Sequence, residues 1–127
     1  MPARGDGSAL AAKTVLVVED DPVMASALQF ALEEDAALVT GPARRLRTAM
    51  REVERQRPDA AILDVELLDG AVYPLADRLR EVGVPFVFYT AHAPREHGRA
   101  QAIGPVVNKS RSCEDAVEKL KEVLAAD

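Results

Sequence analysis

Five polar residues of this chain come directly after apolar runs that are typical of buried strands. Glu19 and Asp20 follow the first run, Asp64 the third, and Thr90 and Lys109 the fourth and fifth. Ligands bind at the carboxyl ends of the strands in an open parallel sheet, so these side chains could meet in one crevice. Three carboxylates held together repel one another, and a divalent cation such as Mg²⁺ would relieve that repulsion. The pattern indicates Mg²⁺-assisted phosphoryl transfer, with Asp64 as the nucleophile that becomes an aspartyl phosphate and with Thr90 and Lys109 holding phosphoryl oxygens.

Strands and helices are expected to alternate along the chain. Apolar runs predict five strands, which cover residues 14–18, 37–39, 60–63, 85–89 and 105–107. Apolar residues at helical spacing predict helices within residues 22–34, 46–57, 74–82 and 112–125. The stretch 94–103 is a poor helix candidate, because it contains Gly98 and few apolar residues in phase. This alternation predicts an α/β fold, a doubly wound five-stranded parallel sheet with strand order 2-1-3-4-5.

The length and composition are those of one globular domain. The chain has 127 residues, 48% of them hydrophobic and 29% charged, and we expect a flexible N-terminal segment over 1–12 and a domain over 13–127. The net charge of −5 argues against nucleic acid or an anionic membrane as partner. Cys113, the single cysteine, excludes an internal disulfide and suits a cytoplasmic location. No apolar run reaches the roughly 18 residues of a membrane span.

Four short motifs, in the same order along the chain, resemble the receiver domains of two-component response regulators. They are Val-Leu-Val-Val-Glu-Asp-Asp-Pro over 15–22, Ile-Leu-Asp over 62–64, Tyr-Thr-Ala over 89–91, and Lys109. The resemblance extends over residues 13–125. It implies a flavodoxin-like receiver fold and a Mg²⁺-dependent domain that takes a phosphoryl group from a histidine kinase.

The resemblance also implies a role for each site residue. Asp64 would be the phosphoacceptor, and Thr90 and Lys109 would contact the phosphoryl group. The metal ligands would be Glu19, Asp20, Asp64 and the backbone carbonyl of Glu66.

A narrower resemblance is to the alphaproteobacterial single-domain regulators called the FAT GUY group. Tyr-Pro-Leu-Ala-Asp over 73–77 and Gly-Val-Pro-Phe-Val-Phe over 83–88 carry it, although the chain has Phe-Tyr-Thr-Ala-His where the group takes its name. Three positions depart from the usual receiver pattern. Ser110 stands where most receivers have proline, Val106 where they have an aromatic switch residue, and Leu68 where proline is frequent. The active site is therefore expected to be complete, while the usual output switch is not.

Three functions remain open from the sequence. The favoured one is a single-domain response regulator that signals through protein contacts. It would act on a downstream protein or a phosphotransferase, act back on its kinase, or serve as a sink that removes phosphoryl groups from the kinase. The second is an inert pseudo-receiver that serves as a binding module. The third is an aspartyl-phosphate phosphatase, since Asp-Val-Glu over 64–66 resembles the Asp-x-Asp motif of haloacid-dehalogenase-type hydrolases. Chain order argues against the third, because in those enzymes the motif follows the first strand.

Other conspicuous residues have ordinary explanations. Arg44, Arg47, Arg51 and Arg55 recur on one helix face and indicate a solvated surface, with docking to an acidic partner as the alternative. The two histidines, at 92 and 97, lack a third ligand for a metal and are expected to be surface residues. Cys113 is expected to be partly buried.

Overall fold

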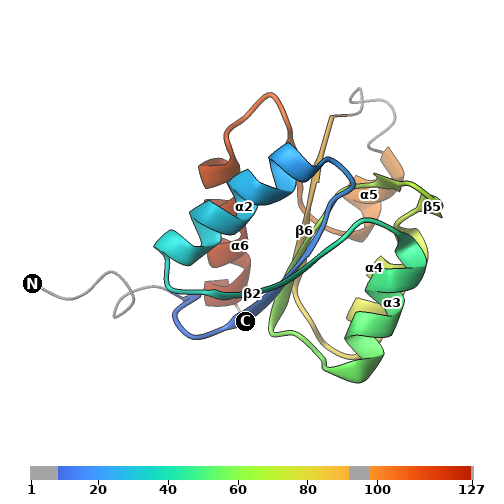
Figure 1. The fold of residues 1–127 in the computed structure, drawn as a ribbon, viewed down its shortest axis with the longest axis horizontal. Helices are drawn as coiled ribbons and strands as arrows, with labels where there is room; N and C mark the ends of the chain where they lie inside the picture. Colours follow the sequence, from blue (N-terminus) through green and yellow to red (C-terminus); the bar gives the residue numbers. More distant parts are fainter. Residues whose placement is uncertain (1–8, 92–97, 127) are drawn as a thin grey trace, which may run out of the picture.

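The structure, a computed structural model, describes residues 9–91 and 98–126. Strands and helices alternate along these residues, except that two short strands follow the third strand of the sheet (Figure 1). Their order is β1 (Thr14–Val18), α2 (Pro22–Glu34), β2 (Leu38–Ala43), α3 (Leu46–Arg55), β3 (Ala60–Leu63), β4 (Glu66–Leu67), β5 (Gly70–Ala71), α4 (Tyr73–Glu81), β6 (Phe86–Thr90), α5 (Gly98–Ile103), β7 (Val106–Asn108) and α6 (Cys113–Ala126).

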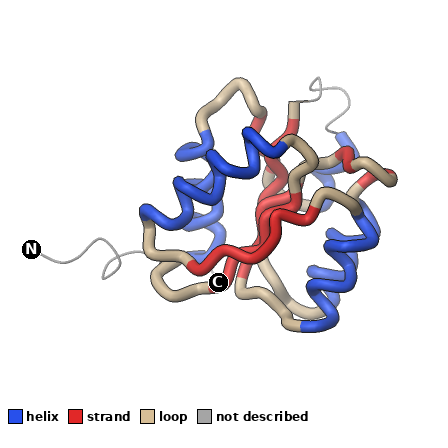
Figure 2. The backbone as a smooth tube through the Cα atoms, viewed as in Figure 1, coloured by secondary structure: helices blue, strands red, loops and turns tan. Residues whose placement is uncertain are grey.

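A five-stranded sheet forms the centre of the molecule, with helices on both faces (Figures 1 and 2). Its strands lie in the order β2-β1-β3-β6-β7, and every neighbouring pair is parallel. Counted among the sheet strands alone, this is the order 2-1-3-4-5, so the predicted topology is confirmed. In this order β1 and β3 are neighbours, and their carboxyl ends form the switch point at which ligands bind in such sheets.

Alternating side chains of the central strands build two cores. Leu16, Leu63 and Phe88 face the helices α3, α4 and α5, while Val17, Ile62 and Tyr89 face α2 and α6. Each of these six side chains is at most 1% exposed. Strands covered on both faces explain why their sequences read as continuous apolar runs, with no polar residue at every second position.

The edge strand β2 is longer than predicted. Residues 37–39 were expected to form a strand closed by Gly41 and Pro42, but the strand runs through both residues to Ala43. Proline is tolerated here because an edge strand need not donate every amide to a neighbour. Gly41 has φ of +90°, and a Cβ atom there would lie 2.7 Å from the carbonyl oxygen of Val17, so only glycine fits this position.

Two further segments differ from the sequence-based expectation. Residues 98–103 do form a short helix, α5, anchored by the fully buried Ala100 and by Arg99, whose guanidinium carbon lies 4.1 Å from the centre of the Tyr73 ring. The remainder of the stretch 94–103 lies outside the described residues. Within the segment expected to be flexible, residues 9–12 form a turn in which Leu10 is fully buried, so packing begins before residue 13. No helix of the described residues is long and apolar enough to cross a membrane.

A small hairpin after β3 holds the start of α3. Strands β4 and β5 pair antiparallel, and Asp69 lies in the turn between them. The Asp69 carboxylate accepts hydrogen bonds from the backbone amides of Leu46 (2.5 Å) and Arg47 (3.2 Å). The residue before α3, Arg45, makes no side-chain cap of its own, so Asp69 satisfies amides that the helix leaves unpaired.

We expect Asp69→Asn to destabilise α3 in a pH-dependent way. Burial alone would raise the pKa of Asp69, but the hydrogen bonds from Leu46 and Arg47 outweigh it and hold the pKa below the usual 3.8. A depressed pKa means that this stabilisation is complete above the unfolded-state value and is lost as pH falls through the folded-state value. Urea unfolding between about pH 3 and pH 6 is the measurement. The stability difference between wild type and variant should stay constant above about pH 4 and shrink below it; a difference that grows towards acid pH would contradict the cap.

Candidate functional site

The three acids predicted to form the site lie together at the carboxyl ends of β1 and β3. One carboxylate oxygen each from Glu19, Asp20 and Asp64 lies within 4.8 Å of the others. Glu19 is 1% exposed and Asp64 is 7% exposed, whereas Asp20 is half-buried. The amide of Asp64 donates to the Val18 carbonyl (2.9 Å), which fixes the two strand ends side by side. This is the crevice that the strand-end pattern predicted.

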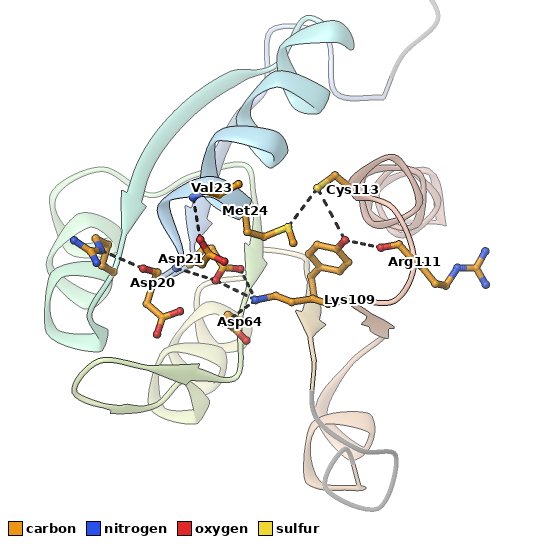
Figure 3. Close-up of polar contacts among 11 residues, drawn as sticks. Asp20, Asp21, Val23, Met24, Asp64, Lys109, Arg111 and Cys113 are labelled. Carbon is orange, nitrogen blue, oxygen red and sulfur yellow. Dashed lines mark hydrogen bonds and ion pairs between the residues drawn. The ribbon is translucent and has the colours of Figure 1, made fainter.

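Lys109 reaches into this cluster from the end of β7 (Figure 3). Its Nζ lies 2.9 Å from Oε1 of Glu19, and it donates to Oδ2 of Asp64 at 3.0 Å. The side chain is only 16% exposed, so these ion pairs are shielded from water on most sides. One ammonium therefore bridges the two most deeply buried carboxylates of the site.

The electrostatics of the cluster show that the lysine compensates the acids only in part. Burial raises the pKa of Glu19 to about 7; the hydrogen bond from Lys109 opposes this rise and the charge of Asp64 adds to it. For Lys109, burial acts to lower the pKa, but the hydrogen bond to Glu19 and the charge of Asp64 outweigh it and the pKa is raised. Lys109 therefore stays protonated, and the cluster keeps an excess of negative charge.

Thr90 is the last residue of β6 and lies next to the end of β7. Its backbone carbonyl accepts a hydrogen bond from the Lys109 amide at 2.8 Å. The side chain is completely buried, yet its hydroxyl oxygen has no hydrogen-bond partner among the residues that the structure describes. A buried hydroxyl without a partner is costly, so this group is suited to a polar ligand that enters the site.

The donor set fits a hard divalent cation. Carboxylate oxygens are ligands that Mg²⁺ prefers, and Mg²⁺ usually binds through one or two carboxylates together with water. Asp20 is half-buried and so open to such a partly hydrated ion, while Glu19 and Asp64 supply buried charge behind it. Residues Glu19, Asp20 and Asp64 could therefore hold Mg²⁺ where their carboxylates converge.

Comparison with known proteins identifies the family. The family model described as the response regulator receiver domain matches residues 15–122, which is most of the chain. The chain belongs to this family. The receiver domain is 33% identical over 126 residues to "Probable transcriptional regulatory protein TcrX" of Mycobacterium tuberculosis, covering 95% of this chain and 52% of that protein. The predicted fold class and family resemblance are thus both confirmed.

Two further relatives show the range of similar proteins. The solution structure of SdrG from Sphingomonas melonis Fr1 is 34% identical, with a TM-score of 0.76, and the alignment covers 93% of the receiver domain and 98% of SdrG. The phyllosphere-induced regulator PhyR of Methylorubrum extorquens is 32% identical over 87 residues, which cover 66% of this chain and 33% of PhyR. The receiver domain thus spans about half the length of TcrX and a third of PhyR, but nearly all of SdrG.

The side chain of Tyr89 holds the loop that follows Lys109, a role that the sequence-based analysis missed. Its buried hydroxyl donates a 2.6 Å hydrogen bond to the backbone carbonyl of Arg111, two residues after Lys109 (Figure 3). Burial raises the pKa of Tyr89, so the hydroxyl remains a donor. Together with the bond from the Lys109 amide to Thr90, this ties the loop after β7 to β6 at two points. A tyrosine in a fully apolar strand was the available signal, since a buried hydroxyl needs a partner.

We expect Tyr89→Phe to disturb the site through this loop. Removal of one hydrogen bond to a part-buried carbonyl should lower the free energy of unfolding by about 1 kcal/mol. Labelling of the predicted phosphoacceptor Asp64 by a small phosphodonor should slow severalfold, because Lys109 is held less firmly. The matched control is Tyr73→Phe, which changes the other tyrosine, on the opposite face of the sheet. Equal labelling rates for wild type and Tyr89→Phe would show that the bond to Arg111 does not position Lys109.

The remaining sequence-based predictions have mixed outcomes. Cys113 is half-buried as expected, with its Sγ 3.5 Å from Sδ of Met24 (Figure 3). The histidines at 92 and 97 lie outside the described residues. Glu66 lies in β4, two residues after Asp64, and the metal contact of its carbonyl remains a prediction.

Proposed function

We propose that this receiver domain accepts a phosphoryl group onto Asp64 from the phosphohistidine of a histidine kinase, in a Mg²⁺-dependent reaction. The observation that carries the proposal is the Lys109 ammonium, which contacts the carboxylates of both Asp64 and Glu19 at the edge of the sheet. A lysine in this place neutralises the carboxylate nucleophile and can then neutralise a phosphoryl oxygen. A buried acid cluster without this cation would repel an anionic donor.

Each residue of the site has a separate role in the proposed phosphoryl transfer. An Asp64 oxygen attacks phosphorus, the bond between phosphorus and the imidazole nitrogen breaks, and its electron pair stays on the departing imidazole. Lys109 remains protonated and stabilises negative charge on one phosphoryl oxygen, and the Thr90 hydroxyl donates to another. Asp20, Asp64 and the Glu66 carbonyl would hold Mg²⁺, with Glu19 acting through water. When bound, Mg²⁺ supplies positive charge that lets the anionic donor approach the acids.

The wider role that we propose is signalling by protein contacts. The partners would be a histidine kinase and a downstream protein or phosphotransferase, with neither nucleic acid nor a membrane as a target of the domain over residues 13–127. A reduced Cys113 and a kinase partner suit the cytoplasm. Membership of the FAT GUY group stays a prediction that rests on sequence motifs alone.

Incubation with a small acyl phosphate and Mg²⁺, read by intact-protein mass, tests the proposal. We expect a mass gain of one phosphoryl group that needs Mg²⁺ and disappears when the metal is chelated. No gain at any Mg²⁺ concentration would favour the inert pseudo-receiver. Sustained turnover of an aryl phosphate ester would favour the phosphatase.

A further inference from the structure

One side of the molecule, beside the phosphoacceptor site, combines arginines that make no ion pair among the described residues with partly exposed apolar side chains. We call this the basic α3 surface, and it consists of Arg44, Arg47 and Arg51 with Leu46, Met50 and Leu68. Part of it is an open hollow of about 460 Å³ that Leu46, Arg47, Met50 and Arg51 line together with Glu54 and Asp69. In Figure 1, α3 and the β5 hairpin lie next to each other at the edge of the fold that carries this surface.

The arginines of this surface have no acidic partner among the residues that the structure describes. Arg55 pairs with Glu52 at 2.9 Å, and Arg78 pairs with Glu54 at 2.7 Å, so the nearby carboxylates are already used. Within the described residues, Arg44, Arg47 and Arg51 make no ion pair. These three arginines therefore present their charge to solvent, on a chain whose net charge is −5.

The apolar residues of the surface are fixed in place and partly exposed. Leu68 is 51% exposed at the tip of the β4–β5 hairpin, and its amide contacts the Arg44 carbonyl at 3.4 Å. Leu46 and Met50 are half-buried on α3 and pack against the core with one side only. Asp69 caps α3 from the hairpin, so Leu68 and α3 are held as one unit. Apolar side chains beside arginines are the counterpart of an amphipathic helix whose apolar face is flanked by acids.

We propose that the basic α3 surface binds an acidic amphipathic helix of a partner protein. Charge complementarity selects this occupant, since Arg44, Arg47 and Arg51 lack carboxylates that such a helix would supply. Nucleic acid is disfavoured, because its phosphates would leave Leu68 and Met50 without apolar contacts and the chain is acidic overall.

A second copy of the chain fits less well than a different protein. Three of the four acidic residues of α6 are already paired within the chain: Asp115 with Arg111, Glu118 with Lys121, and Glu122 with Lys119, which leaves Glu114 alone to meet the arginines. A contact between α3 of one copy and α6 of another would also be head-to-tail and would not close into a dimer.

A helix bound at this surface would touch groups that hold the phosphoacceptor site. Arg44 Nε donates to the backbone carbonyl of Asp20 at 3.3 Å, and the hairpin begins two residues after Asp64. The binding itself needs no phosphoryl group. Failure of Asp64 to label and failure of the helix to bind are therefore separate results.

The test uses the full chain and a synthetic helical peptide as probe. The peptide carries leucines at helical spacing along one face and glutamates on both flanks; a second peptide replaces the glutamates with lysines. Amide chemical shifts and isothermal calorimetry report the binding. We expect the glutamate peptide to shift amides of residues 44–51 and 66–70, with affinity that falls at higher salt. Arg47→Glu with Arg51→Glu should weaken it by about tenfold or more.

The control variant is Lys13→Glu with Arg80→Glu, which changes the net charge by the same amount at exposed positions outside the basic α3 surface. It should bind like wild type. The proposal is overturned by absence of binding at about 1 mM peptide, by equal binding of the lysine peptide, or by equal weakening in the control. If the chain forms concentration-dependent dimers and the Arg47/Arg51 variant does not, the surface binds a second copy of the chain. If DNA or anionic vesicles bind there, the surface belongs to those ligands. Either result contradicts the proposal.

Discussion

Asp64→Asn is expected to abolish Mg²⁺-dependent phosphorylation completely while leaving the fold intact. Asparagine has the shape of aspartate but no anionic oxygen to attack phosphorus, so the covalent step has no nucleophile. The fold should persist, because Lys109 keeps its partner Glu19 and the Asp64 backbone amide keeps its bond to Val18. Intact mass after incubation with acyl phosphate and Mg²⁺ is the measurement, with the thermal midpoint by circular dichroism as the check on folding. The wild-type label should be lost in alkali, as an acyl phosphate is.

Asp59→Asn is the matched control for this experiment. Asp59 lies just before β3, at the opposite end of the strand from Asp64, and its carboxylate accepts a hydrogen bond from the Thr14 amide at 2.8 Å. The change removes the same charge at the other end of β3, so it tests the effect of net charge away from the site. Asp59→Asn should label like wild type. Labelling of Asp64→Asn at wild-type stoichiometry would place the phosphoacceptor at another residue.

The site could be predicted from sequence because its residues sit at strand ends. Buried strands of a parallel sheet have a strong signature, and a carboxylate or lysine directly after one has a fixed location at the sheet edge. Asp64 and Lys109 are 45 residues apart, yet the register of β3, β6 and β7 brings their side chains into contact. The topology followed from strand and helix alternation, and the positions of the acids followed from the topology.

What the sequence did not reveal depends on contacts between distant side chains and backbone groups. Nothing in the sequence around Asp69 shows that its carboxylate caps a helix that begins more than 20 residues earlier in the chain. Tyr89 was counted as a core residue, because periodicity gives the face of a side chain but not the partner of its hydroxyl. The strand through Gly41 and Pro42 was missed since both residues usually interrupt strands, and only their place at the sheet edge permits them.

Lys109→Ala is expected to destabilise the protein as well as to slow phosphorylation. The substitution leaves the Glu19 and Asp64 side chains, only 1% and 9% exposed, without the ammonium between them, and Glu19 takes up a proton because the hydrogen bond that opposes the rise of its pKa is lost. Removing one partner of a buried ion pair costs more than the pair contributes, because the remaining charge is left desolvated. Since Lys109 is partly open to water, we expect the free energy of unfolding to fall by about 2 kcal/mol, less than for a fully buried pair. Urea unfolding at neutral pH, without Mg²⁺, measures it.

Two further variants separate the charge of Lys109 from its shape. Glu19→Gln combined with Lys109→Ala should recover part of the lost stability, because a glutamine at this buried position needs no proton uptake at neutral pH, yet it should not recover phosphorylation. Lys109→Arg keeps the positive charge and should remain near wild-type stability, but it should label more slowly, since a planar guanidinium cannot occupy the position of the compact ammonium between Glu19 and Asp64. If Lys109→Ala is as stable as wild type, or if Glu19→Gln brings no recovery, the ion pairs of the site do not contribute to folding. If Lys109→Arg labels at the wild-type rate, phosphoryl transfer requires only a positive charge at this position.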